Sequence, residues 1–139
     1  MFAAVLIAAA IIHAPSTPPA AQLAAAQRAA TFHVMVLPAS MQLLRADANR
    51  DGSIVRIEYS IEGAVVTIEE RPPVAPESPL ADTQGQLFNL NGYPAFYREF
   101  SGYRELSSLK WYRTDITVIL SSRDRVNAPL LVDIALELR

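Results

Sequence analysis

The residues with the clearest chemical spacing run from Asp47 to Glu58, DANRDGSIVRIE. Asp47, Asn49 and Asp51 stand at alternate positions, Gly52 follows them, and Glu58 closes the stretch. Calcium loops surround the ion with oxygen ligands at this spacing, a turn at a glycine and a closing carboxylate. The pattern therefore predicts either a calcium site or an Asp/Asn/Gly turn that holds no ion.

The residues on either side of this stretch favour the turn. A calcium loop of this type lies between two helices, whereas VRIEYSIEG alternates apolar and polar residues with the period of a strand. The preceding segment, Gln42 to Ala46, is expected to be a strand as well. We expect a turn between two strands, with Glu58 inside the second one. Calcium binding through Asp47–Glu58 remains an alternative function.

Other candidates for catalysis are few. The chain has no cysteine, which excludes disulfides, thiolate metal sites and a cysteine nucleophile. His33 is the one histidine outside the N-terminal segment, and we expect it at a strand edge or partly exposed. Glu69 and Glu70 are adjacent, so in a strand they point to opposite faces and do not form an acid and base pair. We expect no catalytic residue, no metal site and no cofactor; a hydrolase remains an alternative.

Length and charge limit the function classes further. The chain has 139 residues, of which 51% are hydrophobic, and a formal net charge of −2. These values are typical of one globular domain with a core of its own. A balance so close to neutral gives no reason to expect a nucleic-acid partner.

The N-terminal segment, MFAAVLIAAAIIHA, is apolar and is followed by the linker PSTPP. Its apolar run is about half the ~20 residues that cross a bilayer. It is an atypical signal peptide or uncleaved anchor, part of a transmembrane helix that begins upstream, or a buried helix of a soluble protein. The first two alternatives place the rest of the chain outside the cytoplasm. We therefore expect a signal-like or partial membrane-anchor segment with its linker over 1–19, the only membrane contact, and one extracytoplasmic domain over 20–139.

A hairpin from Ile54 to Arg71 is the best-defined element of that domain. Its first half alternates strictly, and a turn at Glu62-Gly63 would set Tyr59 opposite Val66 and Arg56 opposite Glu69. This register pairs apolar residues with apolar ones and a positive charge with a negative one, which supports it independently.

Turn residues predict further hairpins. Asn91-Gly92 sets Leu90 opposite Tyr93, and Thr114-Asp115 sets Trp111 opposite Val118. Ser101-Gly102 predicts either a tight turn that pairs Glu99 with Arg104 or a longer loop.

The remaining elements follow from propensity and spacing. Helices are expected over Ala20–Ala30 and Ala128–Leu138, and a strand over Phe32–Pro38. The proline-rich stretch from Arg71 to Gly85 is expected to be an exposed, stiff loop.

Aromatic residues crowd into the second half of the chain, either as core or as the wall of a ligand cavity. The second alternative gives six predicted ligand-binding residues, Tyr59, Phe88, Tyr97, Trp111, Ile134 and Leu138.

Several stretches together resemble a known family. FHVMVLP, VRIEYSIEGAVVTIEE, NGYPAFY, LKWYRTDITVILSS and IALELR are similar to an extracytoplasmic domain of unknown function found in anti-sigma-factor-like bacterial membrane proteins. The resemblance covers about Ala20 to Arg139 and extends distantly to the lipoprotein-carrier fold. It implies an α+β fold in which a curved antiparallel β-sheet, a meander of hairpins, carries an N-terminal and a C-terminal helix on one face. It also implies a non-enzymatic sensing or binding module of the cell envelope, with an apolar ligand or a protein partner.

Overall fold

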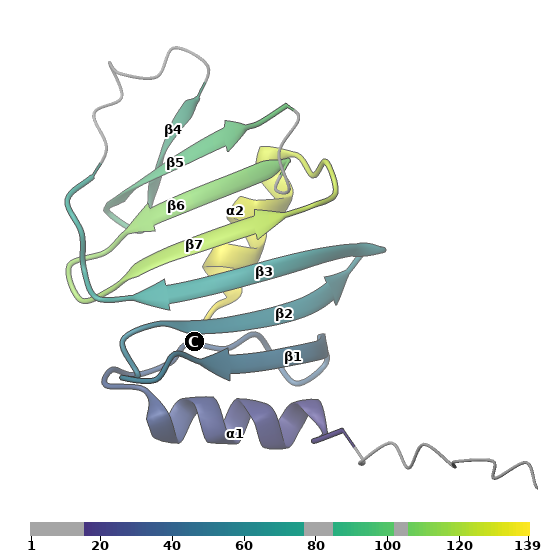
Figure 1. Cartoon of the computed structure of the whole chain (residues 1–139). Helices are drawn as coiled ribbons and strands as arrows, with labels where there is room; N and C mark the ends of the chain where they lie inside the picture. The colour runs from purple at the N-terminus through teal and green to yellow at the C-terminus, as the bar shows by residue number, and fades with distance from the viewer. Residues whose placement is uncertain (1–15, 77–84, 102–105) are drawn as a thin grey trace, which may run out of the picture.

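Seven antiparallel strands form one sheet in the computed structural model, which describes residues 16–76, 85–101 and 106–139. The spatial order of the strands is β1-β2-β3-β7-β6-β5-β4. In chain order the strands are β1 (Gln42–Ala48), β2 (Val55–Ile61), β3 (Ala64–Arg71), β4 (Gln86–Leu90), β5 (Tyr93–Glu99), β6 (Ser107–Tyr112) and β7 (Thr117–Ser122). Figure 1 shows this curved, open sheet with α1 (Pro19–Ala29) at one edge and α2 (Ala128–Glu137) behind it, which confirms the α+β fold class.

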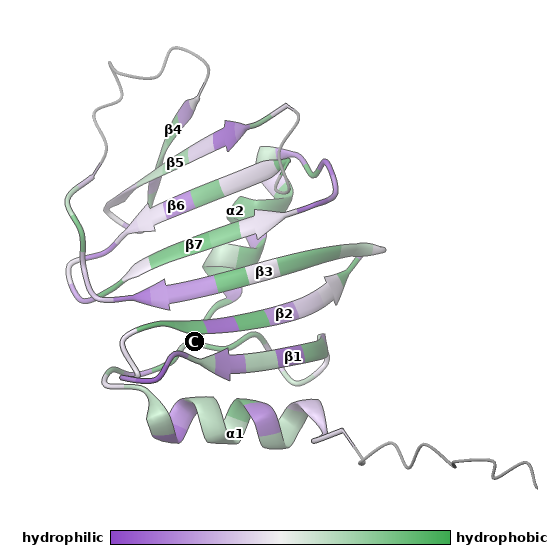
Figure 2. Ribbon diagram, viewed as in Figure 1, coloured by the Kyte–Doolittle hydropathy of each residue, from purple (hydrophilic) through white to green (hydrophobic). Residues whose placement is uncertain are grey.

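The registers predicted for three hairpins are confirmed. Tyr59 lies opposite Val66 and Arg56 opposite Glu69 in the β2–β3 pair. Glu62 and Gly63 both have positive φ angles, 51° and 82°, as the type I′ turn of a two-residue hairpin requires. Figure 2 shows the resulting alternation of hydrophobic and hydrophilic residues along β2. The pairs at the Asn91-Gly92 and Thr114-Asp115 turns also have the predicted register.

The strand order is not a single meander. β1 to β3 form one meander and β4 to β7 form another, and each runs from an edge of the sheet to its middle. Residues 72–85 carry the chain from β3 to the far edge, and β7 then returns to pair with β3. Part of the predicted proline-rich loop, residues 77–84, lies outside the described residues.

The structure decides between two local alternatives and corrects one local prediction. Glu99 pairs with Ser107 and not with Arg104, so a longer loop, and not a tight turn at Ser101-Gly102, joins β5 to β6. Residues 102–105 of that loop lie outside the described residues. Phe32–Pro38 is extended but belongs to no strand of the sheet. We call this segment the strap, because it crosses the inner face of the sheet, the face that α2 covers.

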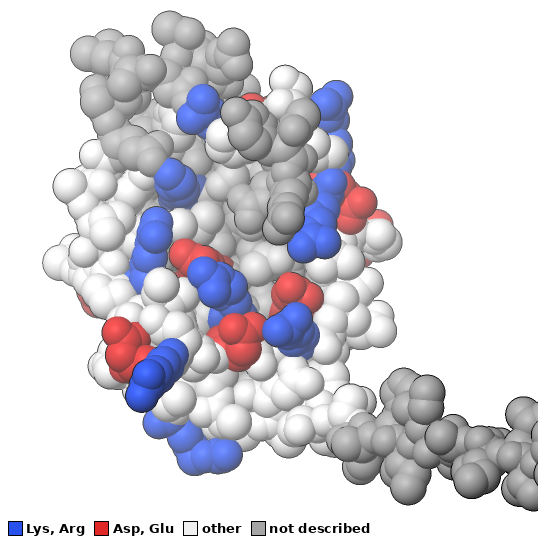
Figure 3. All heavy atoms as spheres, viewed as in Figure 1, with Lys and Arg blue, Asp and Glu red and all other residues white. Residues whose placement is uncertain are grey.

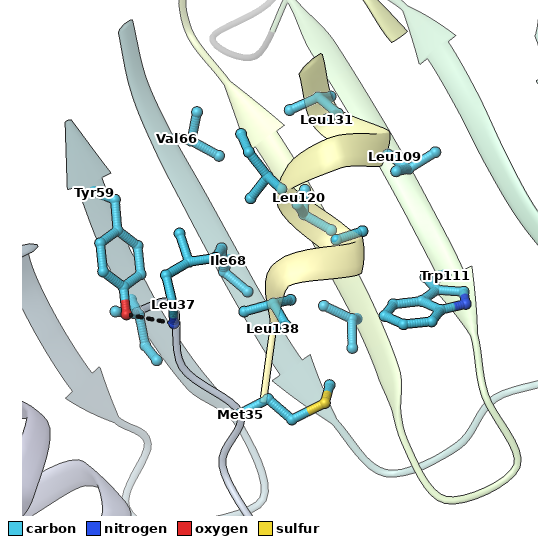
Figure 4. Close-up of a cluster of buried hydrophobic side chains, with 14 of the residues drawn as sticks. Met35, Leu37, Tyr59, Val66, Ile68, Leu109, Trp111, Leu120, Leu131 and Leu138 are labelled. Atoms are coloured by element: carbon cyan, nitrogen blue, oxygen red, sulfur yellow. Dashed lines mark hydrogen bonds between the residues drawn. The ribbon is translucent and has the colours of Figure 1, made fainter. Parts of the chain in front are cut away.

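The core lies between that inner face and α2. Asn127 caps α2 by accepting a hydrogen bond from the backbone N–H of Leu130 (3.0 Å). Leu131, Ile134 and Leu138 are at most 4% exposed, as the helical spacing predicted. Figure 4 shows Leu131 and Leu138 over Leu120 and Ile68, with Trp111 beside the helix.

The helix α1 runs alongside the edge strand β1 (Figure 1). The side chain of Gln22 accepts a hydrogen bond from the backbone N–H of Ala46 (3.1 Å), which occupies a donor of the sheet edge. Ala26 is the buried residue of this alanine-rich helix. Among the described residues, neither helix is long and apolar enough to span a bilayer.

Candidate functional site

The six predicted ligand-binding residues do not gather around one cavity. Five of them are buried in the core, and Phe88 is half-buried. Three have polar groups that are satisfied by the fold: the Tyr97 hydroxyl donates to the carbonyl of Val126 (2.8 Å), the Trp111 ring N–H donates to that of Leu90 (3.3 Å), and the Tyr59 hydroxyl accepts from the backbone N–H of Leu37 (3.2 Å). Tyr59 and Leu138 line two different hollows. The aromatic residues of the second half of the chain therefore belong mainly to the core, and they do not form the wall of one ligand cavity.

The stretch from Asp47 to Glu58 forms the expected turn between β1 and β2. The Asn49 side chain accepts from the backbone N–H of Ile54 (2.9 Å), and Asp51 accepts from both the backbone and the hydroxyl of Ser53 (3.0 and 2.6 Å). These hydrogen bonds from Ser53 lower the pKa of Asp51. Glu58 lies inside β2, opposite Thr67 of β3, and does not close the loop. The stretch is thus not an EF-hand.

The glycine of that turn has a structural purpose. Gly52 has a φ of +71°, and a Cβ there would lie 1.9 Å from the carbonyl oxygen of Ala29 at the end of α1. The Gly52 carbonyl accepts a hydrogen bond from the backbone N–H of Thr31 (3.0 Å). Only glycine allows both the backbone angle and this close approach, so the turn fixes the point where α1 leads into the strap.

The strap is held by hydrogen bonds to side chains and to the end of the chain, and not by the backbone ladder of a neighbouring strand. Met35 donates its backbone N–H to a carboxyl oxygen of Glu70 (3.0 Å), and Leu37 donates to the Tyr59 hydroxyl (3.2 Å; Figure 4). Between them, Val36 exchanges two backbone hydrogen bonds with Arg139 at the end of the chain (2.8 and 3.1 Å). Two inner-face side chains and the last residue therefore hold the strap against the sheet.

Glu70 is the buried carboxyl of this arrangement, with 0% of its surface exposed. It lies in β3 between Val55 and Val118 of the neighbouring strands. Burial raises its pKa from 4.5 to about 7, although the hydrogen bond from Met35 and the charge of Arg113 oppose the shift. The second carboxyl oxygen, Oε1, has no hydrogen-bond partner among the described residues.

The apolar hollow lies between α1, the strap, β1 and β2, and has a volume of about 400 Å³. One face of α1 contributes residues at helical spacing, Ala20, Leu23, Ala24 and Gln27. The other walls are Val36, Leu37, Pro38, Ala39, Met41, Leu43 and Tyr59. No charged side chain is among these lining residues, and Gln27 and Tyr59 are the polar ones.

A second hollow of about 550 Å³ lies on the other side of the strap and is more polar. His33, Arg113, Asp115 and Arg139 line it together with apolar residues of the strap and of α2's end. The Arg113 side chain forms an ion pair with Asp115 (3.1 Å) and lies 5.1 Å from the centre of the Trp111 ring. His33 is exposed on the strap and is not within a group of three or more metal-ligating residues in the described part of the chain.

The outer face of the sheet, turned away from α2, carries charges of both signs. Glu69 lies 2.8 Å from Arg56 and 3.6 Å from Arg71. Figure 3 shows basic and acidic side chains interspersed over the middle of this face. Glu69 and Glu70 thus lie on opposite faces, as predicted.

The sequence analysis predicted neither the strap nor the buried position of Glu70. A signal for Glu70 was present, because it follows Val66 and Ile68 at alternate positions and therefore shares their inner face. No signal in the sequence distinguishes the strap from a true strand. No family model, curated protein or solved structure shows a significant match to this chain.

Proposed function

We propose that this chain is a non-enzymatic extracytoplasmic module that binds one apolar chain of an amphiphilic ligand in the apolar hollow. The observation that supports this proposal is a hollow of about 400 Å³ lined by eleven residues, none of them charged. Small-molecule sites are concave, mostly apolar and of about 300–1,000 Å³. An apolar chain gains free energy by leaving water, and it leaves no charged lining group unpaired.

The composition of α1 explains why the space exists. Ala20 and Ala24 lie on the face of α1 that lines the hollow. Leu23, on the same face, is partly buried against the core, so the helix is anchored while its alanines leave room. A larger residue at the alanine positions would fill the hollow.

The second hollow fits such a ligand less well. An apolar chain there would compete with the Arg113–Asp115 ion pair and would lie against His33 and Arg139. Removing charged groups from water without a new partner costs several kcal/mol. This comparison favours the hollow beside α1.

The extracytoplasmic location and the envelope context are part of the proposal. They rest on the apolar N-terminal run, residues 2–12, and on the resemblance to domains of anti-sigma-factor-like membrane proteins. In that context, binding of a ligand in the hollow would change how the module interacts with a protein partner in envelope regulation.

Binding of N-phenyl-1-naphthylamine, a neutral apolar fluorophore, tests the proposed site. Ala24→Phe places a ring in the hollow and is expected to weaken probe binding at least tenfold. Ala21→Phe is the matched control, because Ala21 is exposed on α1 and does not line the hollow; its affinity should stay within twofold of the unmodified protein. Equal probe affinity in the two variants would overturn the site, and no saturable binding to the unmodified protein would overturn the function.

A further inference from the structure

The strap forms part of the wall of the apolar hollow. Val36, Leu37 and Pro38 line it, and Tyr59 both lines it and accepts the hydrogen bond of Leu37. Met35 lies next to these residues and is anchored by Glu70. Any displacement of the strap from Glu70 therefore changes the wall of the hollow.

The anchor at Glu70 holds the strap best when its carboxyl group carries a proton. A carboxylate there would be removed from water with one hydrogen bond, at Oε2, and with Oε1 unpartnered among the described residues. A charged acceptor would strengthen the bond from Met35, but the desolvation cost is the larger effect, since the net shift of the Glu70 pKa is upward. Water can reach the buried carboxylate only if the groups that cover it move.

We propose that Glu70 is a positioning residue that latches the strap as a wall of the apolar hollow, and that loss of its proton loosens the strap and eases entry of the ligand. The ligand in this inference rests on the proposed function, whereas the latch itself does not. Glu70 touches no ligand; it acts through Met35 and the strap.

Other charged and titratable groups lie on the elements around Glu70. They are Tyr59 on β2, His33 on the strap, Arg113 and Asp115 between β6 and β7, and Arg139 after α2. Arg113 acts on Glu70 in the direction that favours the charged carboxylate, and Asp115 partly neutralises Arg113 through their ion pair. His33 lies on the strap itself, so a His33→Asn variant separates its contribution from that of Glu70.

Hydrogen exchange tests the latch without any ligand. Protection factors of the Met35, Val36 and Leu37 amides, measured by NMR at pH 6 and pH 8, are expected to fall about tenfold over this interval if the opened strap restores an ordinary carboxyl pKa. Glu70→Gln keeps an oxygen acceptor for Met35 and removes the titration, so its protection factors should be independent of pH. Glu69→Gln, the neighbouring carboxyl on the outer face, and His33→Asn should both behave like the unmodified protein.

Tyr59→Phe is a second variant in case Glu70→Gln does not fold. It removes the acceptor for Leu37 and should lower the protection of that amide while leaving the pH dependence at Met35 unchanged. Protection factors of the unmodified protein that do not change between pH 6 and pH 8 would overturn the latch. The same pH dependence in Glu70→Gln would overturn it as well.

Ligand entry provides the functional readout. The association rate constant of N-phenyl-1-naphthylamine, measured by stopped flow, is expected to rise about tenfold from pH 6 to pH 8 and to be constant in Glu70→Gln. A pH-independent association rate would overturn gating by the strap. If the exchange result holds and the probe does not bind at either pH, the proposed function fails and the latch stands.

Discussion

The β2–β3 hairpin and the strap both contribute side chains to the core, yet their backbones are held by different kinds of hydrogen bonds. In the hairpin, each residue from Val55 to Ile61 is paired with a residue of β3. In the strap, successive amides are bound by the side chains of Glu70 and Tyr59, both in the β2–β3 hairpin, and by the backbone of Arg139 at the end of the chain. A strand ladder opens only with its sheet, whereas side-chain anchors can release one segment and leave the sheet intact.

Breaking the hairpin should have the largest effect. Ile68 is 0% exposed, and Ile68→Asp would place a carboxylate among apolar side chains. We expect a loss of about 4 kcal/mol or more in the free energy of unfolding, a large part of what a domain of this size has. Urea denaturation followed by circular dichroism measures this loss. Ser60→Asp on the outer face is the control, and a cooperative transition of normal midpoint in Ile68→Asp would contradict the core assignment.

The pH dependence of stability should come next in size. The pKa of Glu70 is about 7 in the folded chain and 4.5 when it is exposed by unfolding, so the folded state binds more protons between these values. The free energy of unfolding therefore falls as pH rises through this window, by about 3 kcal/mol in total. Because other carboxyls also titrate, the measured quantity is the difference between the unmodified protein and Glu70→Gln. A difference that does not change between pH 4.5 and pH 7 would argue against the buried, protonated carboxyl.

Truncating a buried side chain of the strap should lower the free energy of unfolding by less than the substitution in the hairpin does. Leu37 is 5% exposed, and Leu37→Ala is expected to lose about 2 kcal/mol, the low end for such a change, because the strap can relax into the space. The β2–β3 amide signals in an NMR spectrum should keep their positions. Loss of dispersion across the whole spectrum would show that the strap is as integral to the fold as the hairpin.

Calcium is expected to have the smallest effect. The Asp51 carboxylate is already bound by Ser53, and Glu58 lies away from the turn in β2. Millimolar calcium should therefore change the melting temperature by no more than about one degree, since a ligand stabilises only well above its dissociation constant. A larger increase that disappears in Asp51→Ala would instead support the calcium alternative.

The hairpins could be predicted from the sequence because their determinants are local. Strict alternation from Val55 to Ile61, together with the Glu62-Gly63 and Asn91-Gly92 turns, fixes which residues face each other. The capped helix α2 is determined by the residues of its own segment in the same way.

The strap and the strand order could not be predicted because their determinants are distant in the sequence. Met35 finds its acceptor 35 residues away, and Val36 pairs with the last residue of the chain. A short apolar run such as Phe32–Pro38 fits a buried strand and a covering segment equally well. The crossing from β3 to β4 depends on which edge the second meander joins, and residues 72–85 contain no turn signal that fixes this.

The apolar hollow was missed for a related reason. A sequence identifies residues that prefer to be buried, and the six predicted residues are such residues. It does not show where packing stays incomplete, which here depends on alanines of α1 lying opposite the strap.

An NMR titration of the ¹⁵N-labelled protein with N-phenyl-1-naphthylamine shows directly whether an apolar ligand binds in the hollow beside α1. We expect saturable shifts of the amide signals of Leu23, Ala24 and Gln27 in α1 and of Val36 and Leu37 in the strap, and no shift of the signals of Arg113 and Asp115. Shifts centred on Arg113 and Asp115, or no saturable shift in α1 and the strap, would contradict binding in this hollow.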